Sequence, residues 1–291
     1  MKRQKFNKLG IALAGGGGRG AYQVGVFRAL LERQLFDKAQ ILAGTSVGAL
    51  NSVLFLHRDF HLANYIWRCK IEQAILYLDK GRFRQPLENF WGDQGSDKSL
   101  FEQIKGLFQE SGFKAGIFSR EGLVNILRNE MDLSVVKKSR QKVYATATRA
   151  SNKVVEFFSL NTLKPDELIN ILLASSALPG IFSREYINGK EYYDGGIHHN
   201  VPIDILYQEG CDLILVVHLF RTRDKVAHHL YPNTTIIELT PESSLGGMMG
   251  VLDFSSRNVH DLIGRGYTDN IDILSSISHR FLIKSRPKFF S

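Results

Sequence analysis

A serine between two glycines stands where a short apolar run gives way to a helical pattern. Gly44-Thr45-Ser46-Val47-Gly48 has the G-x-S-x-G spacing, in which the glycines let the serine occupy a strained strand-to-helix turn with an exposed hydroxyl. Free amides and the positive dipole end at the start of the helix that begins at Val47 would stabilise negative charge near Ser46. A serine in this place is often only a helix cap, but the apolar strand before it and the buried helix after it favour a nucleophile.

An upstream glycine run, Gly15-Gly16-Gly17-Gly18-Arg19-Gly20, has two interpretations. Its successive backbone amides can bind the oxyanion of a tetrahedral intermediate. Its G-x-G-x-x-G spacing is also typical of dinucleotide-binding turns, which need an acidic residue after the second strand. Here that strand ends in Gly44-Thr45-Ser46 and Asp37 precedes it, so the oxyanion site is favoured. We expect Arg19 either to pair with backbone or carboxylate groups, which would fix the turn, or to point into solvent.

A serine nucleophile needs a base, and both a carboxylate and histidines are available. Asp194 follows the strand-like Tyr192-Tyr193 and precedes Gly195 and Gly196, so its carboxylate can project from a strand end beside an open backbone. An aspartate with a pKa of about 4 is a poor base unless burial raises that pKa or the proton moves together with the attack. Taken alone, the Asp-Gly pair is typical of a turn. His198, His199 and His260 therefore stay open as alternative bases.

The elements that must position these residues follow an α/β pattern. Leu9 to Ala14 and Ile41 to Ala43 are expected strands, each feeding a helix, at Ala21 to Glu32 and at Val47 to Leu56. Parallel strands that alternate with helices predict a mainly parallel sheet with helices on its faces. The other expected strands are Lys142–Thr148, Val154–Ser159, Leu213–Leu219 and Thr234–Leu239, with a helix at Pro165–Ala174.

One domain should contain all of these elements. We predict a core over about 9–240, interrupted by a helical excursion over about 59–130 that is a candidate lid, and a C-terminal helical segment over about 246–274. The 291 residues, 44% of them hydrophobic, are enough for one large core. Within the excursion, the apolar residues Phe83, Leu87, Phe90 and Trp91 are candidates for lining an acyl-chain site.

Charge and composition limit the partners and the compartment. The net charge of +8 favours transient contact with anionic surfaces, and since no nucleic-acid reading motif accompanies it, nucleic acid is not expected as a partner. Cys69 and Cys211 have no CxxC partner, which indicates neither a disulfide framework nor a zinc site. The apolar run at Leu9 to Ala14 is too short for a secretory signal, and no stretch approaches the roughly 20 residues of a membrane span. We expect a cytoplasmic protein that touches membranes peripherally.

Together the motifs resemble those of the patatin-like phospholipase family. The glycine run resembles the family's oxyanion motif, Gly44 to Gly48 its nucleophile motif, and Asp194 to Gly196 its base motif. ASSALPGIF at Ala174 to Phe182 and Asn200-Val201-Pro202 also agree, so the resemblance spans about Leu9 to Pro202. It implies a three-layer α/β/α fold.

The resemblance also implies a reaction. Ser46 would be the nucleophile and Asp194 the base, with the Gly16 and Gly17 amides and Arg19 forming the oxyanion site, and no metal or organic cofactor would be needed. The implied substrates are lipid esters, namely phospholipids or lysophospholipids. A soluble carboxylesterase or thioesterase that uses the same dyad is the nearest alternative, and a dinucleotide-binding protein that uses the Gly15 to Gly20 turn is the alternative from another class.

Overall fold

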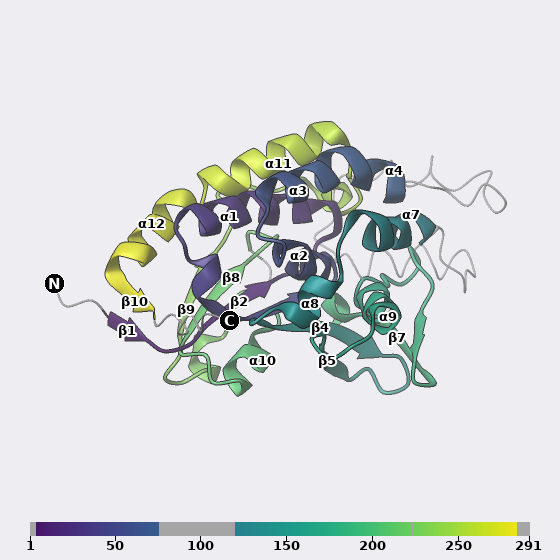
Figure 1. Ribbon diagram of the computed structural model, residues 1–291, viewed down its shortest axis with the longest axis horizontal. Coiled ribbons are helices and arrows are strands. Elements are labelled where there is room, and N and C mark those ends of the chain that lie inside the picture. The colour runs from purple at the N-terminus through teal and green to yellow at the C-terminus, as the bar shows by residue number, and fades with distance from the viewer. Residues whose placement is uncertain (1–3, 76–119, 223, 284–291) are drawn as a thin grey trace.

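The central feature of the fold is a sheet with helices packed on both faces (Figure 1). The computed structural model describes residues 4–75, 120–222 and 224–283. Most of the expected helical excursion, with its candidate acyl-chain residues Phe83, Leu87, Phe90 and Trp91, lies outside the described residues. Within them, the predicted three-layer α/β/α arrangement with a mainly parallel sheet is confirmed.

The main sheet has eight strands among the described residues, in the order β6-β7-β4-β3-β2-β8-β9, with β5 paired to β4. The four inner strands and β9 run parallel, whereas β5 and β7 run antiparallel to β4. A separate pair joins β1 to β10 in parallel. The strands are β1 (Gln4–Phe6), β2 (Leu9–Leu13), β3 (Ala39–Thr45), β4 (Lys142–Arg149), β5 (Val155–Ser159), β6 (Glu185–Ile187), β7 (Lys190–Asp194), β8 (Leu213–Val217), β9 (Thr235–Leu239) and β10 (Phe281–Ile283).

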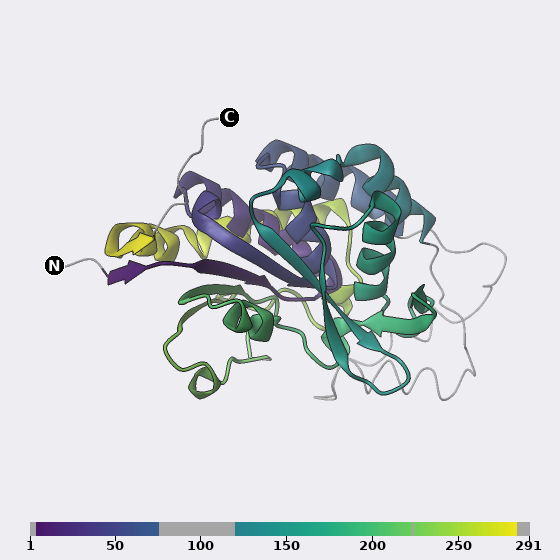
Figure 2. The same cartoon turned by 60° about the horizontal axis from the view of Figure 1, so that its bottom comes forward.

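Helices cover the two faces unequally. Figures 1 and 2 show most of them together on one side of the sheet, while α10 lies on the opposite side. The α-helices are α1 (Ala21–Glu32), α2 (Val47–Phe55), α3 (Phe60–Tyr65), α4 (Ile71–Ile75), α7 (Glu121–Asn125), α8 (Ser134–Lys138), α9 (Pro165–Ser175), α10 (Ile203–Gln208), α11 (Ser256–Thr268) and α12 (Ile271–Arg280). Short 3-10 helices follow β2 and β7, at Gly17–Gly20 and Gly195–Ile197.

Alternation along the inner strands divides the core between the two faces. In β2, Ile11 and Leu13 lie in the larger core, whereas Ala12 packs in the smaller core on the other face. β8 follows the same alternation. Both faces of these strands are buried, which is why they are apolar throughout rather than half polar.

The expected strands and helices are present, with ends that differ by a few residues. Four features were not predicted: the β6-β7 hairpin, helices α8 and α10, and the β1-β10 pair. Strands β1, β6 and β10 are only three residues long, too short to give a clear two-residue pattern. The expected C-terminal helical segment is two helices, α11 and α12, preceded by a loop.

Candidate active site

Two strands meet end to end beside β4, and the candidate nucleophile and base lie at that junction. Strand β3 pairs in parallel with the first part of β4, ending with Thr45 opposite Thr146. Strand β7 arrives from the other direction, ending with Asp194 opposite Ala147. Both use the same edge of β4, because β5 pairs with residues 144–148 along the other edge. The register therefore brings Ser46, the residue after β3, next to Asp194.

Ser46 occupies the strained turn that its motif predicts. Its backbone has φ of 55° and ψ of −124°, in a region that residues other than glycine rarely adopt. The Ser46 amide donates to Ser175 Oγ at 2.9 Å, and its hydroxyl donates to Asp194 Oδ2 at 2.6 Å. Gly48, in the first turn of α2, is required by close approach, since any side chain there would overlap the Leu13 carbonyl. The whole strand-to-helix turn is thus packed tightly against β2.

The other members of the nucleophile motif have packing positions. Gly44 is the next-to-last residue of β3 and lies against the backbone of Gly48 and Ala49. Val47 is the first residue of α2, is buried, and fills the space beside Gly20.

Asp194 is buried and hydrogen-bonded at both carboxylate oxygens. Oδ2 accepts from Ser46, and Oδ1 accepts from the Gly196 amide at 2.7 Å. Burial raises the pKa of Asp194 to about 6, while the bonds from Ser46 and Gly196 and the positive charge of Arg120 act in the opposite direction. Gly195 packs against Thr146, where a larger residue would overlap the threonine side chain. Burial therefore makes the Asp194 carboxylate more basic, which is the condition that the sequence argument set for this residue to act as a base.

The glycine run leaves β2 beside the nucleophile. The Gly15 amide donates to both the main-chain oxygen and Oδ1 of Asn200, whose side-chain amide donates back to the Gly15 carbonyl and to Asp224. Gly15 also lies against the Ser46 side chain. The amides of Gly16, Gly17 and Gly18 donate to no acceptor among the described residues. They are the backbone donors available to a bound anion.

A C-terminal segment over residues 242–253 packs directly on this run. Gly17 has φ of 56°, and a side chain there or at Gly18 would overlap the carbonyls of Val251 and Asp253. Arg19 is buried rather than directed into solvent. It donates to the carbonyls of Gly246 and Gly247, at 2.9 and 2.8 Å, and its guanidinium stacks over Phe220. Arg19 thus pairs with backbone carbonyls and fixes the turn. This is the first of the two alternatives expected from the sequence.

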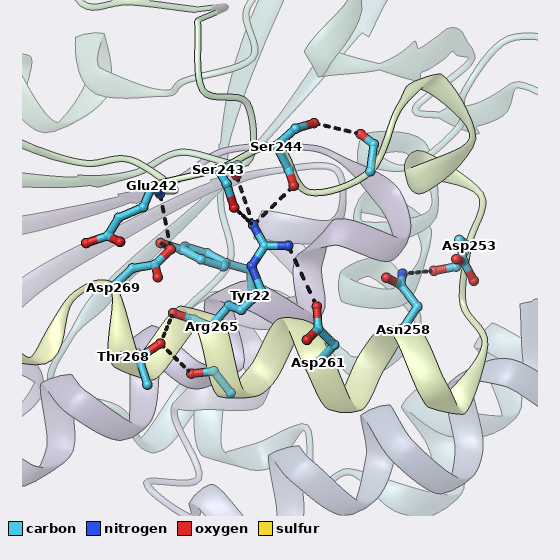
Figure 3. A network of polar contacts seen from close by, with 12 residues as sticks. Tyr22, Glu242, Ser243, Ser244, Asp253, Asn258, Asp261, Arg265, Thr268 and Asp269 are labelled. Atoms are coloured by element: carbon cyan, nitrogen blue, oxygen red, sulfur yellow. Dashed lines mark hydrogen bonds and ion pairs between the residues drawn. The ribbon is translucent and has the colours of Figure 1, made fainter. Parts of the chain in front are cut away.

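The segment is held in turn by helix α11 (Figure 3). Arg265 donates to the Ser243 carbonyl and hydroxyl and to the Ser244 carbonyl, at 2.7 to 3.1 Å. At the other end, the Asn258 side chain donates to the Asp253 carbonyl at 2.9 Å. The contacts therefore run from α11 through this segment to the glycine run.

None of the three histidines considered as bases lies between the nucleophile and the aspartate. His198 Nε2 lies 2.8 Å from the Tyr193 hydroxyl, and His199 Nε2 lies 2.9 Å from Asp204 Oδ2. His260 is exposed on α11. Ser46 donates directly to Asp194, and we refer to these two residues below as the candidate dyad.

Sequence reasoning missed two polar residues that act on Ser46 and Asp194, and one buried histidine elsewhere on the sheet. Ser175, which accepts from the Ser46 amide, lies within the ASSALPGIF block, and that block was the only available signal. Arg120 gave no signal, since it is an isolated arginine before α7. His218 is buried at the end of β8, where burial lowers its pKa, and its Nε2 lies 2.8 Å from Glu238 Oε2. Across the described residues, no group of three or more His, Cys, Asp or Glu side chains could hold a metal ion.

Comparisons with known proteins agree with this geometry. The sequence profile of the family described as Patatin-like phospholipase matches residues 11–207. The probable lipid hydrolase 463L of Invertebrate iridescent virus 6 is 24% identical over 265 residues, covering 82% of this chain and 81% of that protein. The uncharacterized protein YjjU of Escherichia coli K12 is 24% identical over 216 residues, covering 72% of this chain; the match spans about half, 51%, of YjjU.

A solved structure has the same fold. VipD from Legionella pneumophila superposes with a TM-score of 0.54 and 14% sequence identity, over 93% of this chain and 67% of VipD. At 14% identity, the likeness to VipD shows the fold alone. The family assignment rests on the sequence profile. Since the profile covers residues 11–207, it includes the glycine run, the serine turn and the Asp194 turn in one match.

Proposed function

The chain belongs to the patatin-like phospholipase family, and from this premise we propose that it hydrolyses the ester bonds of phospholipids or lysophospholipids, with Ser46 as nucleophile and Asp194 as base. The single observation that carries the proposal is the 2.6 Å hydrogen bond from the Ser46 hydroxyl to a buried carboxylate. A pKa of about 6 leaves that carboxylate mostly ionised at neutral pH, yet far more basic than an exposed aspartate.

In the proposed acylation step, Ser46 Oγ attacks the ester carbonyl carbon as its proton passes to Asp194 Oδ2. The amides of Gly16, Gly17 and Gly18 are the donors proposed for the resulting oxyanion, with the start of α2 adding its positive dipole end. The bond between the acyl carbon and the alcohol oxygen then breaks, and the alkoxide takes the proton held by Asp194 and leaves as the alcohol. The product is an ester between Ser46 and the fatty acyl group.

Deacylation uses the same carboxylate. A water molecule gives its proton to Asp194 and attacks the acyl carbon, and the proton returns to Ser46 Oγ when the fatty acid leaves. The carboxylate thus accepts one proton in each half-reaction and releases it in the same half-reaction. Histidine has no role in this scheme, which agrees with the separate partners of His198 and His199.

The lipid substrate is supported by the family and by the viral relative's name as a probable lipid hydrolase. The net charge of +8 supports peripheral contact with an anionic membrane, where such substrates lie. No helix in the described parts of the chain is long and apolar enough to cross a bilayer. The dinucleotide alternative loses support, because carbonyls of residues 251 and 253 occupy the space that Gly17 and Gly18 would offer to a pyrophosphate.

The test combines active-site labelling with lipid hydrolysis. The purified protein should react covalently with a fluorophosphonate and should release fatty acid from long-chain phospholipid or lysophospholipid vesicles. Ser46→Ala should abolish both, whereas His198→Ala and His199→Ala should retain most of the hydrolysis.

Each contrary outcome has a distinct meaning. Full hydrolysis by Ser46→Ala would end the proposal, and loss of activity in a histidine variant would favour a triad. Cleavage of short nitrophenyl esters or thioesters without cleavage of long-chain lipid would assign the same dyad to a soluble esterase.

A further inference from the structure

An arginine outside the recognised motifs lies close to the dyad. Arg120 immediately precedes α7, within the predicted excursion over about 59–130. Its side chain is only 13% exposed and its guanidinium stacks over the Phe182 ring, 4.3 Å from the ring centroid. Nη1 donates to the Leu173 carbonyl at 2.7 Å. A buried cation therefore sits against the last turn of α9.

That turn holds both proposed catalytic residues by their backbones. Ser175 Oγ accepts from the Ser46 amide at 2.9 Å, and the Ala177 carbonyl accepts from the Asp194 amide at 2.9 Å. Only Ser176 separates these two contacts along the chain. A small shift of the turn that follows Leu173 would move the nucleophile and the base relative to each other.

Arg120 is suited to hold this turn in place. The carbonyls at the end of a helix lack intrahelical partners and carry partial negative charge, so a guanidinium binds them well. The same side chain lies 3.4 Å from Ser176 Oγ and 3.5 Å from the Ser183 carbonyl, which connects the end of α9 to the start of β6. We propose that Arg120 is a positioning residue that fixes the α9 turn, and with it the Ser46 and Asp194 pair, for the acyl transfer.

The charge of Arg120 contributes to the same end. Asp194 faces the Ser46 hydroxyl, the Gly196 amide and the positive charge of Arg120, and the β4 side chain beside it, Thr148, is uncharged. Glu185 on β6 is the carboxylate facing Arg120, with 3.9 Å between Nε and Oε1. Burial lowers the pKa of Arg120 to about 10, which keeps it a cation at neutral pH. That cation favours the ionised form of Asp194 that the base must have before attack.

This inference rests on the proposed function and is tested on the full chain with Arg120→Lys and Arg120→Gln. Arg120→Gln keeps an amide donor but loses the charge, so we expect kcat at pH 7 to fall about tenfold or more with little change in KM. The acid limb of its pH profile should also move to higher pH, because a cause that lowers the pKa of Asp194 is gone. Arg120→Lys keeps the charge, so its acid limb should stay at the wild-type position while kcat falls.

Arg184→Met is the matched control, since Arg184 is an exposed arginine next to β6 that pairs with Glu191. It should leave kcat and the acid limb unchanged. The proposal would be overturned if the Arg120→Gln variant folds, as judged by circular dichroism, and keeps the wild-type kcat and the wild-type acid limb. If Arg120→Gln does not fold, Arg120→Lys decides: its single ammonium replaces a fork that reaches two carbonyls, so a wild-type kcat there would overturn the proposal.

The outcomes separate this inference from the proposed function. A wild-type protein that neither labels nor hydrolyses lipid would contradict the function itself. An active wild type, silenced by Ser46→Ala but indifferent to Arg120, would contradict only the positioning role.

Discussion

At the scale of single residues, burial of Asp194 acts on activity and stability in opposite directions. Taking a carboxylate out of water raises its pKa to about 6, which improves it as a base for a serine hydroxyl. The same burial penalises the charged form that must exist at neutral pH. Two hydrogen bonds, from Ser46 and from the Gly196 amide, offset part of that penalty. Under the proposed function, burial of Asp194 lowers the stability of the fold and raises the reactivity of Ser46.

Asp194→Asn should abolish hydrolysis and stabilise the protein at neutral pH. The folded-state pKa of about 6 lies above the unfolded value of about 3.9, so the native state holds a proton over this window and the carboxylate's contribution to stability is lost as pH rises through 6. Asparagine does not titrate. The stability of the variant relative to wild type should increase by about 3 kcal/mol from well below pH 4 to well above pH 6.

Urea unfolding at pH 4.5 and pH 7.5 should show about 2 kcal/mol of this increase. Asp37→Asn serves as a control, since Asp37 is an exposed aspartate that pairs with the exposed Arg58. A stability difference between Asp194→Asn and wild type that is the same at both pH values would contradict the account.

At the scale of elements, the candidate active site lies where the ends of two strands come together, and segments distant in sequence support it. Strands β3 and β7 stop opposite neighbouring residues of β4, which sets Ser46 against Asp194. The glycine run is held from behind by residues 242–253, which Arg265 of α11 binds at their start. We expect this chain of contacts to keep the free amides of the glycine run aimed at one place.

Arg265→Met should loosen that support without touching the dyad. Loss of three hydrogen bonds to Ser243 and Ser244 should lower kcat several-fold and destabilise the fold by about 1 to 3 kcal/mol, while Ser46 still labels. Steady-state kinetics and limited proteolysis near residues 242–253 measure the two effects. His260→Ala, an exposed change on the same helix, is the control. Wild-type kcat with wild-type protease resistance in Arg265→Met would show that this support is not needed.

Elements that need particular residue types could be predicted from the sequence, whereas contacts to backbone carbonyls could not. A strained turn needs particular residues at fixed spacing, so the Ser46 turn and the glycine run leave a local signature. Buried inner strands leave a continuous apolar run, which is why β2 and β8 were recognised. Arg120 and Arg265 act on backbone carbonyls, and any residue type supplies a carbonyl, so nothing in the local sequence marks their partners. The catalytic roles of Ser46 and Asp194 stay predictions until tested.

At the scale of the whole molecule, the two ends of the described chain close on each other. β1 pairs with β10, and Phe6 meets Phe281 edge to face with 5.0 Å between ring centroids. Helix α11, near the C-terminal end, packs along α1, which directly follows the glycine run (Figure 1). The main sheet likewise combines strands from both halves. Such interleaving predicts one cooperative unit, as the single-domain prediction requires.

Phe6→Ala tests that cooperativity, because Phe6 contacts Phe281 from the opposite end of the described chain. Phe6 is buried, and its loss should cost about 3 kcal/mol of stability. In one cooperative unit, the variant's helical signal in circular dichroism and its ester hydrolysis should disappear together at a lower urea concentration than in wild type. If the closing pair were an independent appendage, the variant would instead keep the wild-type urea midpoint for hydrolysis and lose a small part of the dichroism earlier. Since Val251 and Asp253, which pack on the glycine run, come from the same C-terminal half as β10, we expect the two signals to coincide.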